Sequence, residues 1–178
     1  MDGSLRLEPV SISIRDALAD LLAEYRATGD GSGAEASAAR NGYAGIDGYI
    51  EFWSRIAREG WPERGFVRTD TWIAFRGERA IGDLRLRRTL TPALERDGGN
   101  IGYAVRPSER CNGYATAMLR EALRRAAGLG IARALITVEA TNVASLRVAE
   151  KCGAVDWDDV VADDGAALRR LWIETSRV

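Results

Sequence analysis

Apolar residues recur with a helical period in two segments of the N-terminal third of the chain. The first covers about residues 14–26 and the second residues 46–58. In each segment the apolar side chains fall three or four positions apart, which predicts an amphipathic helix. The stretch between them, residues 28–37, is rich in Gly, Ser and Ala and predicts a loop. This loop is either a plain connector or a mobile lid over a substrate pocket.

Beyond the second helix the apolar period changes to two, which is typical of strands. Further along, short apolar runs alternate with amphipathic segments. We predict strands at residues 71–76, 80–87, 101–105, 134–138, 155–161 and 168–174, helices at residues 112–129 and 145–151, and a helical turn around residues 92–95. The order of these elements favours a mixed α/β (α+β) fold in which helices pack on a sheet.

Length and charge narrow the class of protein. A chain of 178 residues is most simply one domain with a sizeable core. Its hydrophobic fraction of 46% and charged fraction of 29% are those of an ordinary globular protein. The formal net charge of -1 disfavours a nucleic-acid partner or an anionic membrane surface.

The cysteines and the apolar runs indicate a cytoplasmic protein. Cys111 and Cys152 are far apart, and with no His in the chain the sequence predicts no metal site. Reduced thiols are the simpler interpretation, although a disulfide between them stays open. No apolar run approaches the roughly 20 residues of a membrane-spanning helix. The first residues lack the pattern of a signal peptide.

The segment of residues 100–119 carries the clearest chemical signal. A short apolar run stops at Pro107, a polar loop follows at residues 110–115, and an amphipathic helix then begins. A loop that opens a helix offers unpaired backbone N–H groups and the positive end of the helix dipole. Such a site suits a pyrophosphate, so the sequence suggests a phosphate-bearing cofactor.

Within this loop, Arg110-x-x-Gly113-x-Ala115 resembles the acetyl-CoA signature of the GNAT superfamily of N-acyltransferases. A second segment is similar to the strand–Asn–helix part of the same superfamily, through Val138, Asn142, Ser145, Lys151 and Gly153. The resemblance covers about residues 71–175. More narrowly, residues 81–87 and 98–103 resemble a branch of mostly uncharacterised bacterial predicted acetyltransferases.

The resemblance implies a single-domain fold with a mostly antiparallel sheet that is flanked by helices. Its central strands, here residues 103–105 and 135–138, would splay apart and admit the thioester. Residues 1–65 would then supply the N-terminal helices and the substrate-side loop, and residues 66–178 the sheet and the acetyl-CoA-binding core. A homodimer through the terminal strands is consistent with this organisation.

The resemblance also implies how acetyl-CoA would be held. The pantetheine arm would pair with the strand backbone, and the N–H of Val105 would polarise the thioester carbonyl. The residues implied in cofactor binding are Ala104, Val105, Arg110, Cys111, Asn112, Gly113, Tyr114, Ala115, Thr116, Asn142 and Ser145. Gly113 is suited to this role because no Cβ obstructs the approach of a pyrophosphate. Alternatively, Asn142 is only a helix N-cap and Gly113 an ordinary turn glycine. Because the superfamily transfers the acyl group directly, we expect Cys111 to be a packing residue rather than a nucleophile.

Acid–base residues are harder to assign. The positions where relatives in the superfamily carry a base or an acid hold Asn100, Thr137 and Ala149 here. Without His, a general base has to be an acidic residue, a tyrosine or a water that they relay. The candidates near strand ends are Asp83, Tyr103 and Glu139. Alternatively, the two acids are solvated or ion-paired, and the tyrosine belongs to the core.

The sequence therefore predicts an acetyl-CoA-dependent N-acetyltransferase that transfers the acetyl group directly to a primary amine in a ternary complex. The acceptor would be a small molecule or a peptide, and no metal is expected. Because the familiar acid and base are missing, the alternative is a non-catalytic CoA-binding or regulatory module. A nucleic-acid-directed enzyme is disfavoured by the charge.

Overall fold

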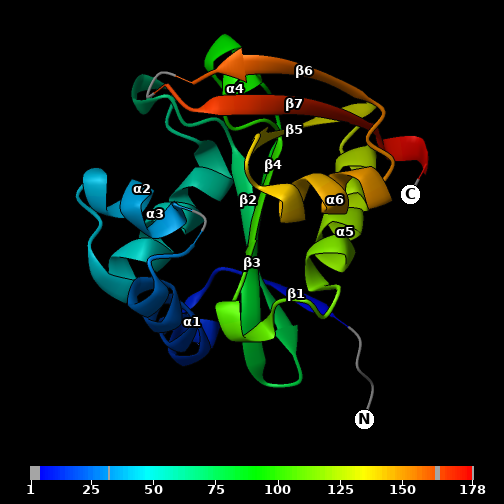
Figure 1. The fold of residues 1–178 in the computed structure, drawn as a ribbon. Helices are drawn as coiled ribbons and strands as arrows, with labels where there is room; N and C mark the ends of the chain where they lie inside the picture. Colours follow the sequence, from blue (N-terminus) through cyan, green and yellow to red (C-terminus); the bar gives the residue numbers. More distant parts are fainter. Residues whose placement is uncertain (1–4, 32, 163–164, 178) are drawn as a thin grey trace. The chain divides into compact units, whose positions relative to one another are not determined.

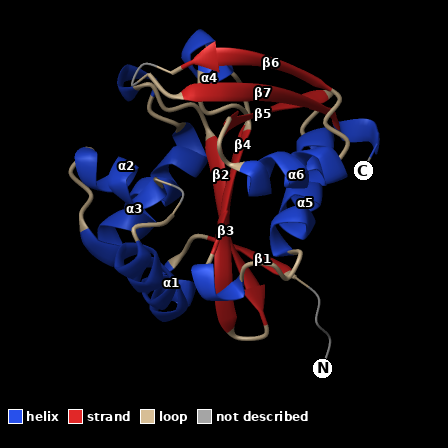
Figure 2. Ribbon diagram, in the orientation of Figure 1, coloured by secondary structure: helices blue, strands red, loops and turns tan. Residues whose placement is uncertain are grey.

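The computed structural model describes residues 5–31, 33–162 and 165–177. Helices and strands follow the predicted order with two additions (Figures 1 and 2). In chain order they are β1 (Arg6–Pro9), α1 (Arg15–Thr28), α2 (Ala34–Arg40), α3 (Gly45–Glu59), β2 (Thr69–Arg76), β3 (Arg79–Arg87), α4 (Pro92–Arg96), β4 (Ile101–Val105), α5 (Tyr114–Gly128), β5 (Arg133–Glu139), α6 (Val143–Lys151), β6 (Asp156–Val161) and β7 (Ala167–Glu174).

The two additions, β1 and α2, have weak sequence signals. β1 spans four residues and pairs antiparallel with β2, too short a run for an alternating pattern to stand out. α2 overlaps residues 28–37, for which the sequence predicts a loop. Its alanines favour a helix, and Ala34 and Ala38, four positions apart, are buried at 3% and 0% exposure. Because Gly and Ser residues surround these alanines, the helical spacing does not stand out in the sequence. The loop prediction was therefore wrong for residues 34–37.

The strands form two sheets, one in the order β1-β2-β3-β4 and the other in the order β5-β7-β6. The pairs β1/β2, β5/β7 and β6/β7 are antiparallel. β4 and β5 therefore belong to different sheets. The fold is mixed α/β with antiparallel sheets and helices, as predicted.

The chain divides into two compact units, and each is described by itself. The first consists of residues 1–85 and 103–114, and the second of residues 86–102 and 115–178. The expected boundary near residue 65 stays a prediction. Among the described residues, no helix is long and apolar enough to cross a membrane.

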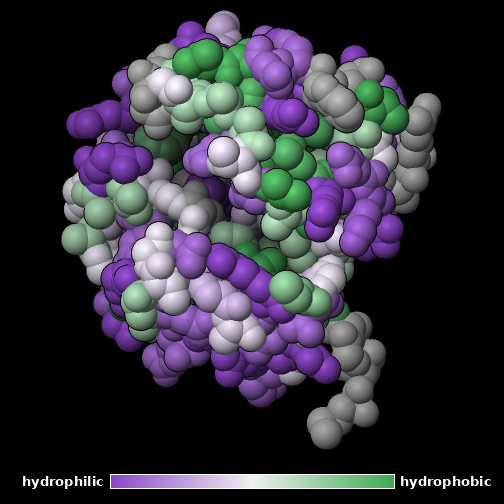
Figure 3. All heavy atoms as spheres, viewed as in Figure 1, coloured by the Kyte–Doolittle hydropathy of each residue, from purple (hydrophilic) through white to green (hydrophobic). Residues whose placement is uncertain are grey.

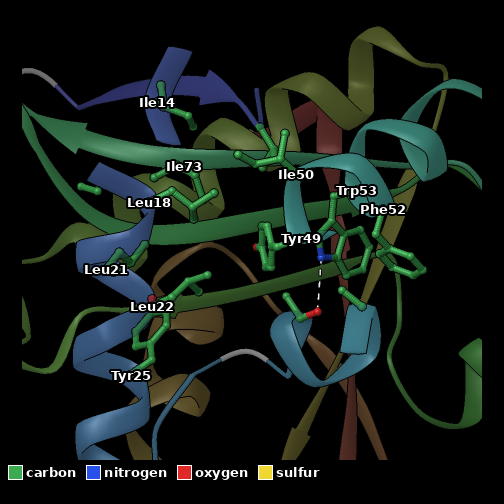
Figure 4. Close-up of a cluster of buried hydrophobic side chains, with 14 of the residues drawn as sticks. Ile14, Leu18, Leu21, Leu22, Tyr25, Tyr49, Ile50, Phe52, Trp53 and Ile73 are labelled. Carbon is green, nitrogen blue, oxygen red and sulfur yellow. Dashed lines mark hydrogen bonds between the residues drawn. The ribbon is translucent and has the colours of Figure 1, made fainter. Parts of the chain in front are cut away.

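The core of the first unit lies between α1, α3 and the strands. Leu18, Leu21 and Leu22 of α1 are turned inward, at 0%, 0% and 5% exposure. They gather with the aromatic residues of α3 (Figure 4), among them Trp53, whose Nε1 donates a hydrogen bond of 3.3 Å to Ala34 O. The surface of α1 seen in Figure 3 is mostly hydrophilic. The helical period of the sequence thus separated the buried from the solvent face of α1.

In the second unit, α5 and β5 contribute many of the buried apolar side chains. The fully buried side chains of these elements are Met118, Leu119, Ala122, Leu123, Ala126, Ala134 and Leu135. Those of α5 recur three or four positions apart, as expected for a helix with one face in a core.

Candidate functional site

The loop between β4 and α5 has a strained backbone. Among the described residues, Cys111 is the only one other than glycine with positive φ, 64°. This conformation costs a residue with a Cβ about 1 kcal/mol. The side chain of Asn112 supports the loop by donating from Nδ2 to Glu109 O at 3.1 Å and to Arg110 O at 3.2 Å. Cys111 is exposed, so the expectation that it is a packing residue is wrong.

The loop leads directly into α5, a helix of 15 residues. The N–H groups of its first turn, at Tyr114, Ala115 and Thr116, lack acceptors within the helix and lie at the positive end of its dipole. Gly113, at φ +80°, has no other atom within 4 Å of the position that a Cβ would take. The backbone thus offers N–H groups beside open space, an arrangement that fits an anion such as a pyrophosphate.

Arg110 already has partners within the first unit. One of its terminal nitrogens lies 3.0 Å from a carboxylate oxygen of Asp30, and its Nε donates to Val105 O at 3.3 Å. The hydrogen bond from Arg110 lowers the pKa of Asp30 below its ordinary value. A phosphate group that bound Arg110 would therefore compete with Asp30 for the guanidinium.

Arg106 anchors the start of this loop to α1. Its side chain is 2% exposed. It donates to Glu24 Oε2 at 2.6 Å, to Asp20 Oδ2 at 2.5 Å and to Ala80 O at 2.9 Å. The second oxygen of Glu24 accepts from the backbone N–H of Ser108 at 2.8 Å. One buried guanidinium thus joins the end of β4 to α1 and β3.

Two hydrogen bonds show which edge of β4 pairs with β3. Arg106 N donates to Ile81 O at 2.8 Å, and Arg87 N donates to Asn100 O at 2.7 Å. Both bonds fit one antiparallel register, in which every second residue of β4 directs its backbone groups toward β3. The backbone N–H and C=O groups of Ala104, like the N–H of Arg106, point toward β3. Those of Val105, the residue between them, point the other way, so the Val105 N–H lies at the opposite edge of β4.

The side chain of Tyr25 meets β4 at this place. Its hydroxyl donates a hydrogen bond of 3.1 Å to Ala104 O. Burial raises the pKa of Tyr25 far above its ordinary value, and the nearby charge of Asp83 raises the pKa further. Tyr25 therefore stays protonated at neutral pH.

Asp83 and Tyr103 occupy opposite faces of their strands. The register places Asp83 opposite Ala104, and Tyr103 then lies on the other face, because side chains alternate along a strand. Asp83 is buried at 2% exposure, and one of its carboxylate oxygens lies 3.9 Å from Nε of Arg85. Of the two alternatives for this acid, the structure shows the ion pair rather than solvation.

Three predicted residues of the second unit, Glu139, Asn142 and Ser145, lie around the start of α6. Asn142 caps this helix, because its Oδ1 accepts a hydrogen bond of 3.1 Å from Ser145 N. The N-cap alternative therefore accounts for the Oδ1 atom of Asn142. It does not involve Nδ2, the other polar group of this side chain. Glu139 ends β5 and is exposed.

The three positions that lack a familiar acid or base have structural roles. Asn100 is 3% exposed, and its Oδ1 accepts from Leu135 N at 2.9 Å, while its Nδ2 donates to Arg87 O at 3.1 Å. Its backbone N–H donates to Leu135 O at 2.7 Å. Thr137 Oγ1 accepts from Gly98 N at 2.8 Å, and Ala149 is fully buried. Asn100 thus links β3 to β5 where β4 begins.

Two residues of this region, Tyr25 and Arg106, were not singled out from the sequence. Tyr25 follows the helical period of α1 and looks like any core residue. Arg106 stands next to Pro107 at the end of a strand, a position that usually faces solvent. Only their contacts across the fold distinguish them. Among the described residues, no cluster of His, Cys, Asp or Glu side chains could hold a metal ion.

The sequence was compared with models of known protein families and with curated proteins. A family model described as an acetyltransferase (GNAT) domain matches residues 5–155. No curated protein matches the sequence.

Several solved structures share the fold. The spermidine/spermine N-acetyltransferase SpeG from Vibrio cholerae is 14% identical, with a TM-score of 0.64 over 97% of this chain and 95% of that one. The ribosomal alpha-N-protein acetyltransferase RimL, in complex with coenzyme A, is 17% identical, with a TM-score of 0.65 over 96% and 94%. A putative acetyltransferase from Salmonella typhimurium with acetyl-CoA is 11% identical, with a TM-score of 0.62 over 96% and 94%. At these identities the likeness shows the fold.

Proposed function

Because this chain belongs to the acetyltransferase (GNAT) domain family, we propose that it transfers an acetyl group from acetyl-CoA directly to a primary amine in a ternary complex. Family membership makes the protein an acetyltransferase; the donor, the acceptor class and the direct transfer are our proposals. Proteins of the same fold include a spermidine/spermine N-acetyltransferase and a ribosomal alpha-N-protein acetyltransferase, so the acceptor proposed here is a small-molecule or peptide amine.

One observation carries the proposal, namely the loop that precedes α5. Its open space at Gly113 and the N–H groups of the following helical turn suit a pyrophosphate. We assign the pyrophosphate to the backbone of residues 111–116, with Arg110 as a charged partner in place of its bond to Asp30. A solved structure of the same fold contains acetyl-CoA, which supports this choice of donor.

The remaining contacts to the donor are proposed along β4 and α6. The pantetheine arm would pair with the backbone of Ala104 and Val105, and the side chains of Asn142 and Ser145 would bond its amide groups. The N–H of Val105 would donate a hydrogen bond to the thioester oxygen. This assignment agrees with the register of β4, which directs Val105 N–H away from β3.

In the proposed reaction, a neutral amine attacks the thioester carbonyl carbon, the C–S bond breaks and an amide forms. The amine nitrogen loses one proton, and the departing thiolate of CoA gains one. Asp83 is the proposed base among the three candidates, because it is a buried carboxylate on the same face of the sheet as Tyr25. Tyr103 and Glu139 stay the other candidates for the base.

The first prediction concerns Gly113. Replacing it with Leu should weaken acetyl-CoA binding about a hundredfold, because the side chain would fill the space proposed for the pyrophosphate. Isothermal titration calorimetry measures the affinity. Gly130→Leu is the matched control, since Gly130 has φ +78° and open space around its Cβ position, but follows the other end of α5. It should bind acetyl-CoA like the wild type.

Equal affinities of the two variants would contradict the proposed place of the pyrophosphate. No heat or thermal shift with the wild type at millimolar acetyl-CoA would contradict the function itself. Release of CoA against a library of amines then tests turnover. Binding without turnover on any amine would favour the non-catalytic CoA-binding module.

A further inference from the structure

The hydroxyl of Tyr25 and the proposed thioester donor share one peptide group. Tyr25 Oη donates to Ala104 O at 3.1 Å. The carbonyl of Ala104 and the N–H of Val105 are the two polar ends of the same planar, conjugated unit. Because Tyr25 is 4% exposed, bulk water hardly competes for its hydroxyl. The hydrogen bond therefore acts on one end of the unit, while the other end points to the free edge of β4.

We propose that Tyr25 is a positioning residue for acetyl transfer, which orients and polarises the Val105 N–H through the Ala104–Val105 peptide. This inference rests on the proposed function, in which that N–H bonds the thioester oxygen. A carbonyl that accepts a hydrogen bond makes the N–H of its own peptide a stronger donor. Backbone donors aimed at a developing oxyanion are among the largest contributions to acyl transfer.

The neighbouring peptide is held by other groups. Its carbonyl, Val105 O, accepts from Arg110 Nε at 3.3 Å, and its nitrogen, Arg106 N, donates to Ile81 O at 2.8 Å. Loss of the Tyr25 hydroxyl alone would therefore leave β4 in place. The expected effect is a weaker N–H donor in an unchanged strand.

The protonation of Tyr25 agrees with this role. Burial first, and Asp83 second, raise its pKa far above the ordinary value. The hydroxyl keeps its proton across the neutral range and serves as a fixed donor. It would be a poor general acid, because proton release from so weak an acid is costly.

Tyr49 provides a matched control. It lies on α3 in the same core cluster, at 1% exposure, and among the described residues its hydroxyl has no hydrogen-bond partner. Figure 4 shows both tyrosines within this cluster. Tyr49→Phe and Tyr25→Phe each remove one buried hydroxyl and keep the ring. Only the second removes a bond to β4.

The test is infrared spectroscopy of bound acetyl-CoA that is isotopically labelled at the thioester carbonyl carbon. With the wild type, the carbonyl band should move to lower frequency on binding, because the Val105 N–H polarises the bond. In Tyr25→Phe this displacement should shrink by about a fifth. In Tyr49→Phe it should equal that of the wild type. Calorimetry should give unchanged affinities for all three proteins.

A kinetic readout follows once the amine screen has supplied an acceptor. Tyr25→Phe should lower kcat about tenfold and change the KM for acetyl-CoA less than about twofold, since the lost interaction acts in the transition state. A purely structural role would instead change affinity and melting temperature together.

A second variant covers the case in which Tyr25→Phe does not fold. Fluorination of the Tyr25 ring makes its hydroxyl a stronger donor and should move the carbonyl band further to lower frequency. An unchanged band in both Tyr25 variants would overturn the inference while acetyl-CoA binding by the wild type stands. Absence of binding by the wild type would instead overturn the proposed function.

Discussion

Gly99→Ala should lower the free energy of unfolding by about 3 kcal/mol, because a Cβ at this position collides with backbone and the residue has left-handed φ. The Cβ would lie 2.4 Å from Leu135 O and 2.9 Å from Leu135 C, at φ +59°. Neither neighbour is a flexible side chain that can turn away. The next residue, Asn100, bonds the same Leu135, so relief of the clash has to break that link.

Gly77→Ala separates the two causes. Gly77 has nearly the same φ, +57°, in the turn between β2 and β3, and nothing lies within 4 Å of its Cβ position. This control should cost about 1 kcal/mol from backbone strain alone. Urea denaturation of both variants measures the difference. Equal losses of stability would show that the close approach of Gly99 to β5 is not a constraint on the fold.

Arg106→Met should lower the free energy of unfolding by about 3 kcal/mol, because it removes a buried guanidinium that satisfies two carboxylates and a strand carbonyl. The side chain keeps much of its apolar length, so a cavity is not the main cause. The groups that lose their donor are Asp20, Glu24 and Ala80 O. Arg15→Met is the control, since Arg15 is exposed and pairs with the exposed Asp47 at the surface. It should cost less than about 1 kcal/mol.

The pH dependence of stability gives Arg106→Met a second readout. Burial raises the pKa of Glu24, but hydrogen bonds from Ser108 and Arg106 outweigh this effect and lower it below the ordinary 4.5. A carboxyl with a lowered folded-state pKa stabilises the fold above its unfolded-state pKa, and this contribution is lost as the pH falls through the folded value. The wild type should therefore lose stability below about pH 4.5 more steeply than the variant. Parallel curves would contradict the role of Arg106 at Glu24.

Some helices and strands of this protein are predicted from the sequence better than others. α1, α3 and α5 have long helical periods, and their buried faces were predicted because one side of a helix has to leave water. β1 and α2 were missed. β1 is defined by its pairing with β2, and α2 by the burial of two small alanines, and neither cause is present in the local pattern.

The sequence determined the class of fold and the loop before α5, because periodicity, a positive-φ glycine and the start of a helix are local properties of the chain. Tertiary structure alone decided the surroundings of that loop. It brought Tyr25 to Ala104 O across a separation of 79 residues and Arg106 to Asp20 across 86. It also made Asn100 a link to β5. Hydrogen bonds between such distant residues depend on how the whole chain packs, and no short pattern encodes them.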